Sequence, residues 1–283
     1  MISALGLWSL AACGTDDNNP EITTPMVASQ EWLLENANNP NVQLLDAYQP
    51  PHRTVTDYNA GHIPGAVAFD VSTIRVNIDG TESVLETPEV AAAAFSAAGL
   101  KDDATIVVYD GNDGVFSARL VWSMRYYGHK DIRLLDGGMP TWATSGRAVS
   151  LDPATFSASS YPVRKPRTDI VVDKEYVLSH LGDPSVFLLD VRSDAEWNAG
   201  YIPGAVHFDW HTAIDNHLFK DASTLLNMYS LPTDKTIVIY CQTGTRASVM
   251  YVALKELGFK DVRIYDGSWF EWGKATDVPI EIP

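Results

Sequence analysis

The sequence predicts an α/β fold built from two similar domains in tandem, each a mainly parallel sheet flanked by helices on both faces. Two observations predict it. Short apolar runs rich in β-branched residues alternate with segments of helical periodicity, which is typical of βα units and of a parallel sheet covered on both faces. The same motifs also occur twice, in the same order, along a chain of 283 residues. That length is sufficient for two domains of ordinary size.

Four segments of the first half return in the second half. The pairs are Leu44–Ala47 with Leu188–Val191, Gly61–Val67 with Gly200–Val206, Thr105–Tyr109 with Thr236–Tyr240, and Gly128–Arg133 with Gly258–Arg263. The separation between partners shrinks along the chain, so the first copy carries extra loop residues. Four matches in one order indicate a tandem duplication.

The repeat divides the chain into four parts. Residues 27–149 and 169–283 are the two copies. Residues 150–168 are rich in Ser, Pro and Ala without sustained periodicity, and we expect them to form a connector draped over both domains. Residues 1–26 are interpreted as a leader followed by a flexible tether.

The leader contains Cys13, one of two cysteines in the chain. The run Leu10-Ala11-Ala12-Cys13 resembles the lipobox of a bacterial lipoprotein signal, in which the cysteine is lipidated. No Lys or Arg precedes Arg53, so the cationic start of such a signal is missing. Either the true start lies upstream of Met1 or the match is accidental. We expect a cell-envelope protein, periplasmic or tethered to the membrane through Cys13, with a cytoplasmic location as the alternative.

Charge and cysteine content exclude several classes of function. The net charge is −16, and no basic block is longer than residues 164–167. Nucleic acid and anionic membrane surfaces are therefore disfavoured as partners. Two cysteines are too few for a disulfide framework. The histidines show no ligand spacing with the cysteines, so we expect neither a metal nor an organic cofactor.

The segment 236–248 predicts a reactive cysteine at the end of a strand. The β-branched run Ile237–Ile239 leads to Cys241, and an apolar-periodic segment follows at Val249–Leu257. A parallel sheet exposes reactive groups at the carboxyl ends of its strands. Inward amides and a helix N-terminus would favour the thiolate, as would the cation of Arg246. The loop residues are Gln242, Thr243, Gly244, Thr245 and Arg246. A cysteine that is merely a small buried hydrophobe would not need Gly244 and Arg246 beside it.

Three motifs carry a family resemblance. They are G-[HY]-I-P-G-A in both halves, the loop from Cys241 to Arg246, and Tyr265-Asp266-Gly267-Ser268-Trp269. Over about residues 27–283 the chain resembles a tandem-domain rhodanese, a sulfurtransferase of the thiosulfate and 3-mercaptopyruvate kind. The resemblance implies an inert first domain and a catalytic cysteine in the second.

The position of Asp110 agrees with an inert first domain. The repeat aligns Asp110 with Cys241, and a carboxylate cannot carry a sulfane sulfur. We interpret Asp110 as an ordinary turn residue beside Gly111. The first loop is expected to lack the cation and the inward amides of the second.

The resemblance also implies a two-step reaction. The Cys241 thiolate attacks the outer sulfur of a small donor such as thiosulfate, and a persulfide remains on the protein. Cyanide or a thiol then removes the sulfur. Inward amides of the loop would stabilise the terminal anion. We expect the protein to be a monomer whose partners in the reaction are these small molecules.

Three other functions remain as alternatives. Phosphatases of this fold, like arsenate reductases, resemble C-x5-R, whereas four residues separate Cys241 from Arg246, so that chemistry is disfavoured. A 3-mercaptopyruvate donor is favoured by the Thr243 hydroxyl and by His62, but no second arginine lies between Arg192 and Gly200. The third alternative is a persulfide carrier or binding module that serves a partner protein. Thiosulfate or another small sulfane donor is the preferred reading.

The resemblance assigns roles to three residues outside the loop. Arg192 would bind the anionic end of the donor. Phe116 and His62 of the first domain would wall the cleft or assist there. Arg192 could instead be a surface ion-pair partner of Asp194 or Glu196, because exposed arginines near acids are common. Phe116 could equally be a core aromatic at a helix start.

Overall fold

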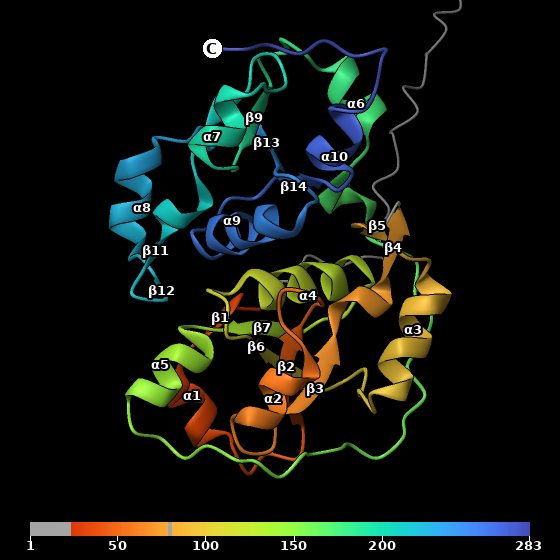
Figure 1. The fold of residues 1–283 in the computed structure, drawn as a ribbon, viewed down its shortest axis with the longest axis vertical. Coiled ribbons are helices and arrows are strands. Elements are labelled where there is room, and N and C mark those ends of the chain that lie inside the picture. The colour runs from red at the N-terminus through yellow and green to blue at the C-terminus, as the bar shows by residue number, and fades with distance from the viewer. Residues whose placement is uncertain (1–23, 79–80) are drawn as a thin grey trace, which may run out of the picture.

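The computed structural model describes residues 24–78 and 81–283 as two α/β units stacked through a pair of central helices (Figure 1). The predicted lipidation site at Cys13 lies outside the described residues. Each unit contains a five-stranded sheet in which all pairs are parallel. The predicted fold class is therefore confirmed. Within the described residues no helix is long and apolar enough to cross a membrane.

The two sheets have equivalent strand orders, β3-β2-β6-β7-β1 and β10-β9-β13-β14-β8. The first contains β1 (Val27–Ala28), β2 (Val42–Tyr48), β3 (Val67–Asp70), β6 (Thr105–Tyr109) and β7 (Ile132–Leu135). The second contains β8 (Val171–Val172), β9 (Val186–Asp190), β10 (Val206–His207), β13 (Thr236–Tyr240) and β14 (Val262–Tyr265). The repeated sequence motifs thus occupy equivalent places, with β6 and β13 at the centres.

Helices cover both faces of each sheet. Those of the first unit are α1 (Gln30–Glu35), α2 (Val55–Ala60), α3 (Pro88–Ala97), α4 (Val115–Tyr126) and α5 (Gly138–Thr144), with the 3-10 turn η1 (Val71–Ile74). The second unit has α6 (Lys174–Ser179), α7 (Asp194–Asn198), α8 (Ala222–Tyr229), α9 (Thr245–Glu256) and α10 (Ser268–Trp272), with η2 (Thr168–Ile170) and η3 (Trp210–Ala213).

The central strands divide their side chains between two faces. In β6, Ile106 and Val108 join the large core that contains α4, whereas Val107 and Tyr109 join a smaller core under α1 and α5. This is the two-residue periodicity of a strand buried on both sides. It explains why the run Thr105–Tyr109 is almost uniformly apolar in the sequence.

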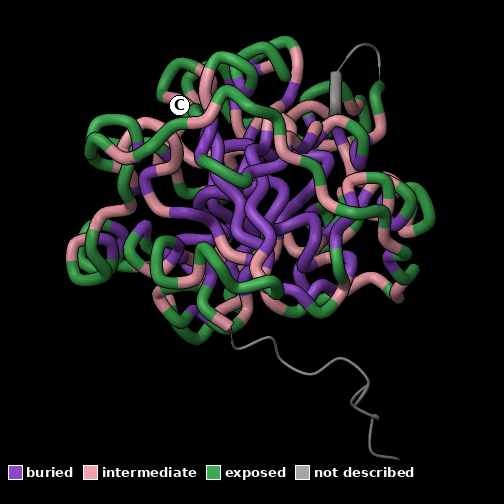
Figure 2. The backbone as a smooth tube through the Cα atoms, turned by 90° about the horizontal axis from the view of Figure 1, so that it is seen from below, coloured by how far each residue is buried: buried purple, intermediate pink, exposed green. Residues whose placement is uncertain are grey.

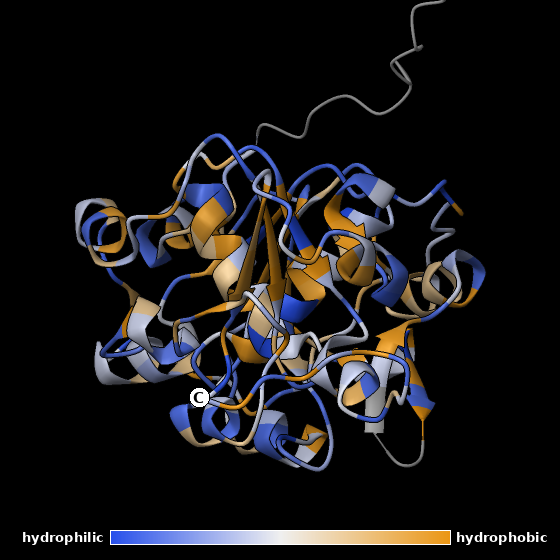
Figure 3. Ribbon diagram, turned by 90° about the horizontal axis from the view of Figure 1, so that it is seen from above, coloured by the Kyte–Doolittle hydropathy of each residue, from blue (hydrophilic) through white to orange (hydrophobic). Residues whose placement is uncertain are grey.

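The two units share one core. Helices α4 and α9 pack against each other, and Trp122 of α4 belongs to the same buried cluster as Met250 and Tyr251 of α9. Figure 2 shows the buried backbone concentrated in the middle of the molecule, and Figure 3 shows hydrophobic strands at the same place. A continuous core of this kind makes the two domains one folded body, because separating them would expose apolar surface.

One short antiparallel hairpin of each unit contacts the other unit. The pair β4 (Arg75–Ile78) and β5 (Thr81–Leu85) belongs to the first unit, and the Leu85 amide donates to Asp266 of the second at 2.8 Å. The pair β11 (Ile214–Asp215) and β12 (Leu218–Phe219) belongs to the second, and the Phe219 amide donates to Asp136 of the first at 3.0 Å. Each hairpin therefore donates a backbone hydrogen bond to the other unit, and the two contacts are equivalent.

The repeated G-x-I-P-G-A turn is tied to the central strand of its own domain. The Ile63 amide donates to the Tyr109 hydroxyl at 2.9 Å, and the Ile202 amide donates to the Tyr240 hydroxyl at 3.1 Å. Tyr109 and Tyr240 are the last residues of β6 and β13. The turn therefore braces the strand end from which each loop departs.

The connector lies along the first domain (Figure 1, green). Residues 151–167 form no helix or strand. Tyr161 is buried with its ring 5.0 Å from Phe95, and its amide donates to Ser96 at 2.8 Å. The segment between the two repeats is therefore anchored by an aromatic side chain, which its Ser- and Pro-rich composition did not reveal.

Candidate active site

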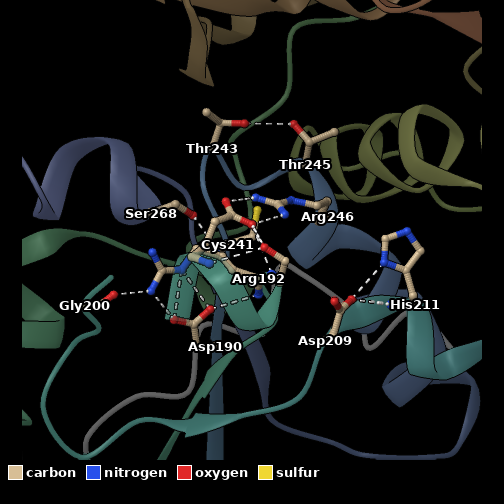
Figure 4. Close-up of polar contacts among 12 residues, drawn as sticks. Asp190, Arg192, Gly200, Asp209, His211, Cys241, Thr243, Thr245, Arg246 and Ser268 are labelled. Atoms are coloured by element: carbon tan, nitrogen blue, oxygen red, sulfur yellow. Dashed lines mark hydrogen bonds and ion pairs between the residues drawn. The ribbon is translucent and has the colours of Figure 1, made fainter. Parts of the chain in front are cut away.

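Cys241 follows the last residue of β13 and is buried, with 1% of its surface exposed. Its amide donates to the Ser268 hydroxyl at 3.3 Å, and its carbonyl accepts from the Trp269 amide at 3.0 Å. The carbonyl of Gln242 accepts from the Phe270 amide at 2.8 Å. The start of α10 thus holds the base of the Cys241 loop, as Figure 4 shows for Ser268. This gives the Tyr265–Trp269 motif a positioning role.

Gly244 ends the loop and begins the helix. Its φ of 76° is left-handed, a region that glycine enters without strain. A Cβ at this position would lie 2.6 Å from Nη1 of Arg119 and 2.8 Å from Oδ1 of Asp266, so no larger residue fits. Helix α9 therefore begins at Thr245, four residues before the apolar segment that the sequence predicted. The earlier start brings the helix N-terminus directly to the loop.

Arg246 lies against Cys241 and is paired with Glu196. Its two terminal nitrogens each donate to a carboxylate oxygen of Glu196 at 2.7 Å. Burial works against the charge of Arg246, but the Glu196 ion pair and the neighbouring Cys241 sulfur raise its pKa above the usual value. Burial likewise opposes ionisation of Glu196, yet Arg246 and Ser193 lower the pKa of that carboxyl to about 2. The site therefore holds the Arg246 cation beside the sulfur, and the Glu196 carboxylate fixes that cation in place.

Glu196 was not among the predicted site residues. It occupies the third position of α7, where its side chain and that of Ser193 form a capping box. The sequence Ser193-Asp-Ala-Glu196 carries this signature. The capping box indicates that Glu196 stands at a helix start but not that this start faces Arg246, fifty residues further along the chain.

Arg192 is buried rather than exposed. Its Nε lies 3.0 Å from both carboxylate oxygens of Asp190, and its Nη2 donates to Asp190 at 2.6 Å and to the Gly200 carbonyl at 2.7 Å (Figure 4). The guanidinium carbon lies 4.2 Å from the centre of the Trp269 ring. The alternative of a surface ion pair is therefore wrong, since Arg192 is 1% exposed and pairs with Asp190. Binding of the donor by Arg192 stays a prediction.

Phe116 and His62 occupy different places in the first domain. Phe116 is buried in the first turn of α4, with its ring 6.4 Å from His52. His62 is fully buried, and its ring nitrogens lie 3.0 Å from the Tyr58 carbonyl and 3.1 Å from the Asp152 carbonyl. Both ring nitrogens face backbone carbonyls, one of α2 and one of the connector. That position differs from the cleft role that the resemblance implied for His62.

The first domain contains the equivalent loop between β6 and α4, one residue longer than the Cys241 loop, with a carboxylate inside it. Asp110 is 1% exposed, and its oxygens accept four backbone amides at 2.7–3.0 Å, those of Asn112, Gly114, Phe116 and Ser117. Gly114 precedes α4 in the left-handed conformation, as Gly244 precedes α9. The expectation that the first loop lacks inward amides is therefore wrong. Asp110 is an anion held in a cradle, not an ordinary turn residue.

The first domain also contacts the Cys241 loop. Arg75 of β4 donates to the Thr243 carbonyl at 2.7 Å and to the Thr245 hydroxyl at 2.9 Å. Arg119 of α4 donates to Asp266 at 2.6 Å. Sequence reasoning missed both arginines, because about 150 residues or more separate each from its partner and no local pattern marks such contacts.

Two cavities occupy equivalent places in the two domains, away from Cys241. One of about 250 Å³ lies between α6 and the turn at Pro203, and one of about 320 Å³ lies between α1 and the turn at Pro64. Neither cavity is lined by Cys241 or its loop.

Comparison with known proteins identifies the architecture. The model of the rhodanese-like domain matches residues 29–145 and 173–275. A mitochondrial thiosulfate/3-mercaptopyruvate sulfurtransferase of Arabidopsis thaliana is 31% identical, over 92% of this chain and 79% of its own length. The sulfur carrier protein TtuD of Thermus thermophilus is 31% identical, over 93% of this chain and 97% of its own.

A solved structure of a related enzyme has the same fold as this chain. The crystal structure of SseA from Escherichia coli, a 3-mercaptopyruvate sulfotransferase, superposes with a TM-score of 0.79 at 27% identity. The match covers 87% of this chain and 99% of SseA. The chain therefore belongs to the rhodanese family, with two rhodanese-like domains in tandem.

Proposed function

We propose that this protein is a sulfurtransferase that moves a sulfane sulfur from a small donor to a thiol or to cyanide through a persulfide on Cys241. The observation that carries the proposal is the pair of equivalent loops. One holds the Asp110 carboxylate with four inward amides, and the other presents a buried cysteine at the same place. A loop that binds an anion in this way suits a thiolate and a persulfide equally.

The first half-reaction breaks the S–S bond of the donor. The Cys241 thiolate attacks the outer sulfur of thiosulfate, a new S–S bond forms, and sulfite leaves with the bonding electron pair. In the second half-reaction, cyanide attacks the terminal sulfur and leaves as thiocyanate, which returns the thiolate. A thiol acceptor instead leaves as a hydropersulfide or, if it is a dithiol, closes to a disulfide and releases sulfide.

The repeat supports an assignment of the amides that would stabilise the terminal sulfur. Counted from the starts of α4 and α9, Gly114, Phe116 and Ser117 correspond to Gly244, Arg246 and Ala247. Three amides directed at the terminal anion, together with the N-terminus of α9, would supply the stabilisation that an oxyanion hole supplies to oxygen. Arg246 adds a full positive charge beside the sulfur.

The identity of the donor belongs to this proposal. We favour thiosulfate or another small sulfane donor, and 3-mercaptopyruvate is the second candidate. Both are supported by the names of relatives, since the Arabidopsis enzyme is named for the two donors together. A carrier role is supported in the same way by TtuD. All of these functions require the same persulfide.

Steady-state turnover tests the assignment. Thiosulfate and 3-mercaptopyruvate should be compared side by side, each with cyanide and with a dithiol as acceptor. Thiosulfate is expected to give the higher kcat/KM, and a ping-pong pattern is expected with every active pair. A clear preference for 3-mercaptopyruvate would reassign the donor. Sulfur loading without turnover on any acceptor would favour the carrier role.

A further inference from the structure

Arg75 is a buried cation of the first domain that ends on the catalytic loop of the second. It begins β4 and is 3% exposed. Its Nη2 donates to the Thr243 carbonyl at 2.7 Å, and its Nη1 donates to the Thr245 hydroxyl at 2.9 Å. These two partners stand on either side of Gly244. The guanidinium therefore bridges the turn that leads from Cys241 into α9.

The first domain holds this guanidinium in a fixed plane. Nε and Nη2 donate to the Ser83 carbonyl at 3.1 and 2.6 Å, and Nη1 donates to the Gln49 amide oxygen at 3.0 Å. A guanidinium is planar and presents its donors in a rigid fork. Contacts within its own domain thus set the direction of the two donors that reach Thr243 and Thr245.

The Thr243–Gly244 peptide is the one that this contact orients. In a planar trans peptide the carbonyl and the next amide point in opposite directions. Because Arg75 draws the Thr243 carbonyl toward the first domain, the Gly244 amide is turned the other way. In the first domain the equivalent amide, that of Gly114, points at the Asp110 carboxylate at 3.0 Å. The equivalence of the two glycines predicts that the Gly244 amide faces Cys241 in the same way.

The glycine also makes a flip of this peptide possible. Glycine accepts both signs of φ at little cost, so rotation of the peptide before Gly244 meets a low conformational penalty. A flipped peptide would point a carbonyl oxygen, rather than an amide, at the anionic sulfur. The contact from Arg75 opposes this flip, because it would be lost from a buried position where an unpaired donor is costly.

We propose that Arg75 is a positioning residue for the Cys241 loop, which makes the active site a product of both domains. The inference rests on the proposed persulfide chemistry. The first domain, although it carries no cysteine at the aligned position, supplies the group that keeps the Gly244 amide turned inward. Thr245 is the receiving residue on the second domain.

Three variants of the full chain test this role. Arg75→Ala removes both contacts, Arg75→Lys keeps the charge without the fork, and Thr245→Val removes the hydroxyl alone. Arg125→Ala is the matched control, because Arg125 is also a buried arginine of the first domain, and its hydrogen bonds go to Thr24. The readouts are thermal unfolding, the pH profile of Cys241 alkylation by iodoacetamide, and the single-turnover rate of sulfur loading from thiosulfate.

Arg75→Ala is expected to move the midpoint of the alkylation profile to higher pH and to slow sulfur loading roughly tenfold. Complete loss of one oxyanion-hole donor lowers kcat about 10²–10³-fold. A peptide that is flipped for only part of the time should lower the loading rate by less. Arg75→Lys should recover part of both effects, and Thr245→Val should show a smaller change. Arg125→Ala should lower the unfolding temperature while both other readouts stay at their wild-type values.

Two results would overturn the proposal. In one, Arg75→Ala, or Arg75→Lys where the alanine variant does not fold, leaves the alkylation midpoint and the loading rate unchanged. In the other, Arg125→Ala shifts both as far as Arg75→Ala does, which would reduce Arg75 to a contact that only joins the domains. The alkylation profile needs no sulfur donor. A wild-type protein that fails to load sulfur would therefore refute the proposed function separately.

Discussion

Each arginine around the Cys241 loop is engaged by a partner in the protein. Arg75 contacts Thr243 and Thr245, Arg119 contacts Asp266, Arg192 contacts Asp190, and Arg246 contacts Glu196. The positive charge near the sulfur thus serves first to fix the loop. An anionic donor must be met chiefly by backbone amides and by the start of α9, against a net charge of −16 for the whole chain.

Arg192→Ala tests the difference between donor binding and loop support. Both partners of the Arg192–Asp190 pair are essentially unexposed, and removing one member of such a pair costs about 3–5 kcal/mol of unfolding free energy. We expect a loss of about 3 kcal/mol in urea unfolding and a similar slowing of both half-reactions. An unchanged stability together with a raised donor KM alone would restore the donor-binding role that the family resemblance implied.

Glu196 gives the stability of the protein a defined pH dependence. Its folded-state pKa of about 2 lies below its ordinary value of 4.5. The carboxylate therefore stabilises the fold fully above about pH 5, and this contribution is lost as the pH falls through 2. Glu196→Gln should lower the unfolding free energy by about 1–2 kcal/mol at pH 7, since the pair is partly exposed to solvent.

The control for Glu196 is the comparison of wild type with Glu196→Gln across the acid range. The gap in unfolding free energy should narrow as the pH falls from about 5 to 2. A gap that stays constant over this interval would mean that the carboxylate charge adds nothing to stability.

At the scale of single elements, the strand–loop–helix unit explains why the sequence was informative about Cys241. An apolar β-branched strand, a glycine and a following helix are all local signals, and they placed the cysteine at the carboxyl end of β13. The amide cradle of the first domain was not predicted, because Asp110 beside Gly111 reads equally well as a turn. Only the folded backbone shows where the amides of α4 point.

Asp110→Cys tests what disables the first loop. The cradle amides remain, but the place of Arg246 is taken by Phe116. The guanidinium of Arg53 lies near this loop but is paired with Asp46, so we expect it to activate a cysteine less than Arg246 does. Titration with thiosulfate is expected to load one sulfur per chain, on Cys241 alone. Two sulfurs per chain would show that amides suffice to activate a cysteine in this fold and that the aspartate alone inactivates the first domain.

At the scale of the whole molecule, the duplication predicted the two sheets but not the way in which they meet. The repeats predict equivalent strand orders, and the structure has them. The structure also contains contacts between the units that the repeats do not predict. They are made by the two hairpins and by the arginines that cross between the domains, and they join residues far apart in the sequence. No periodicity or motif marks Arg75 as a partner of Thr243, so the composite nature of the site emerged only from the fold.

The leader supports a separate proposal, that Cys13 tethers the protein to the cell-envelope membrane. Lipidation of a cysteine adds acyl chains that partition into the bilayer, and more than one chain gives stable anchoring. Cys13→Ser should move the protein from the membrane fraction to the soluble fraction of cells, with turnover of the purified protein unchanged. Identical fractionation of the variant and the wild type would argue against the lipobox.

The central claim is that sulfur travels on Cys241, and the mass of the intact protein tests it most directly. After incubation with thiosulfate and removal of excess donor, the wild type should gain about 32 Da, located on the Cys241 peptide and lost again on addition of cyanide. Cys241→Ser should fold normally, gain no mass and show no turnover, because a serine hydroxyl is neither ionised at neutral pH nor able to form a persulfide. A wild-type protein without the adduct, or a serine variant that still transfers sulfur, would contradict the account.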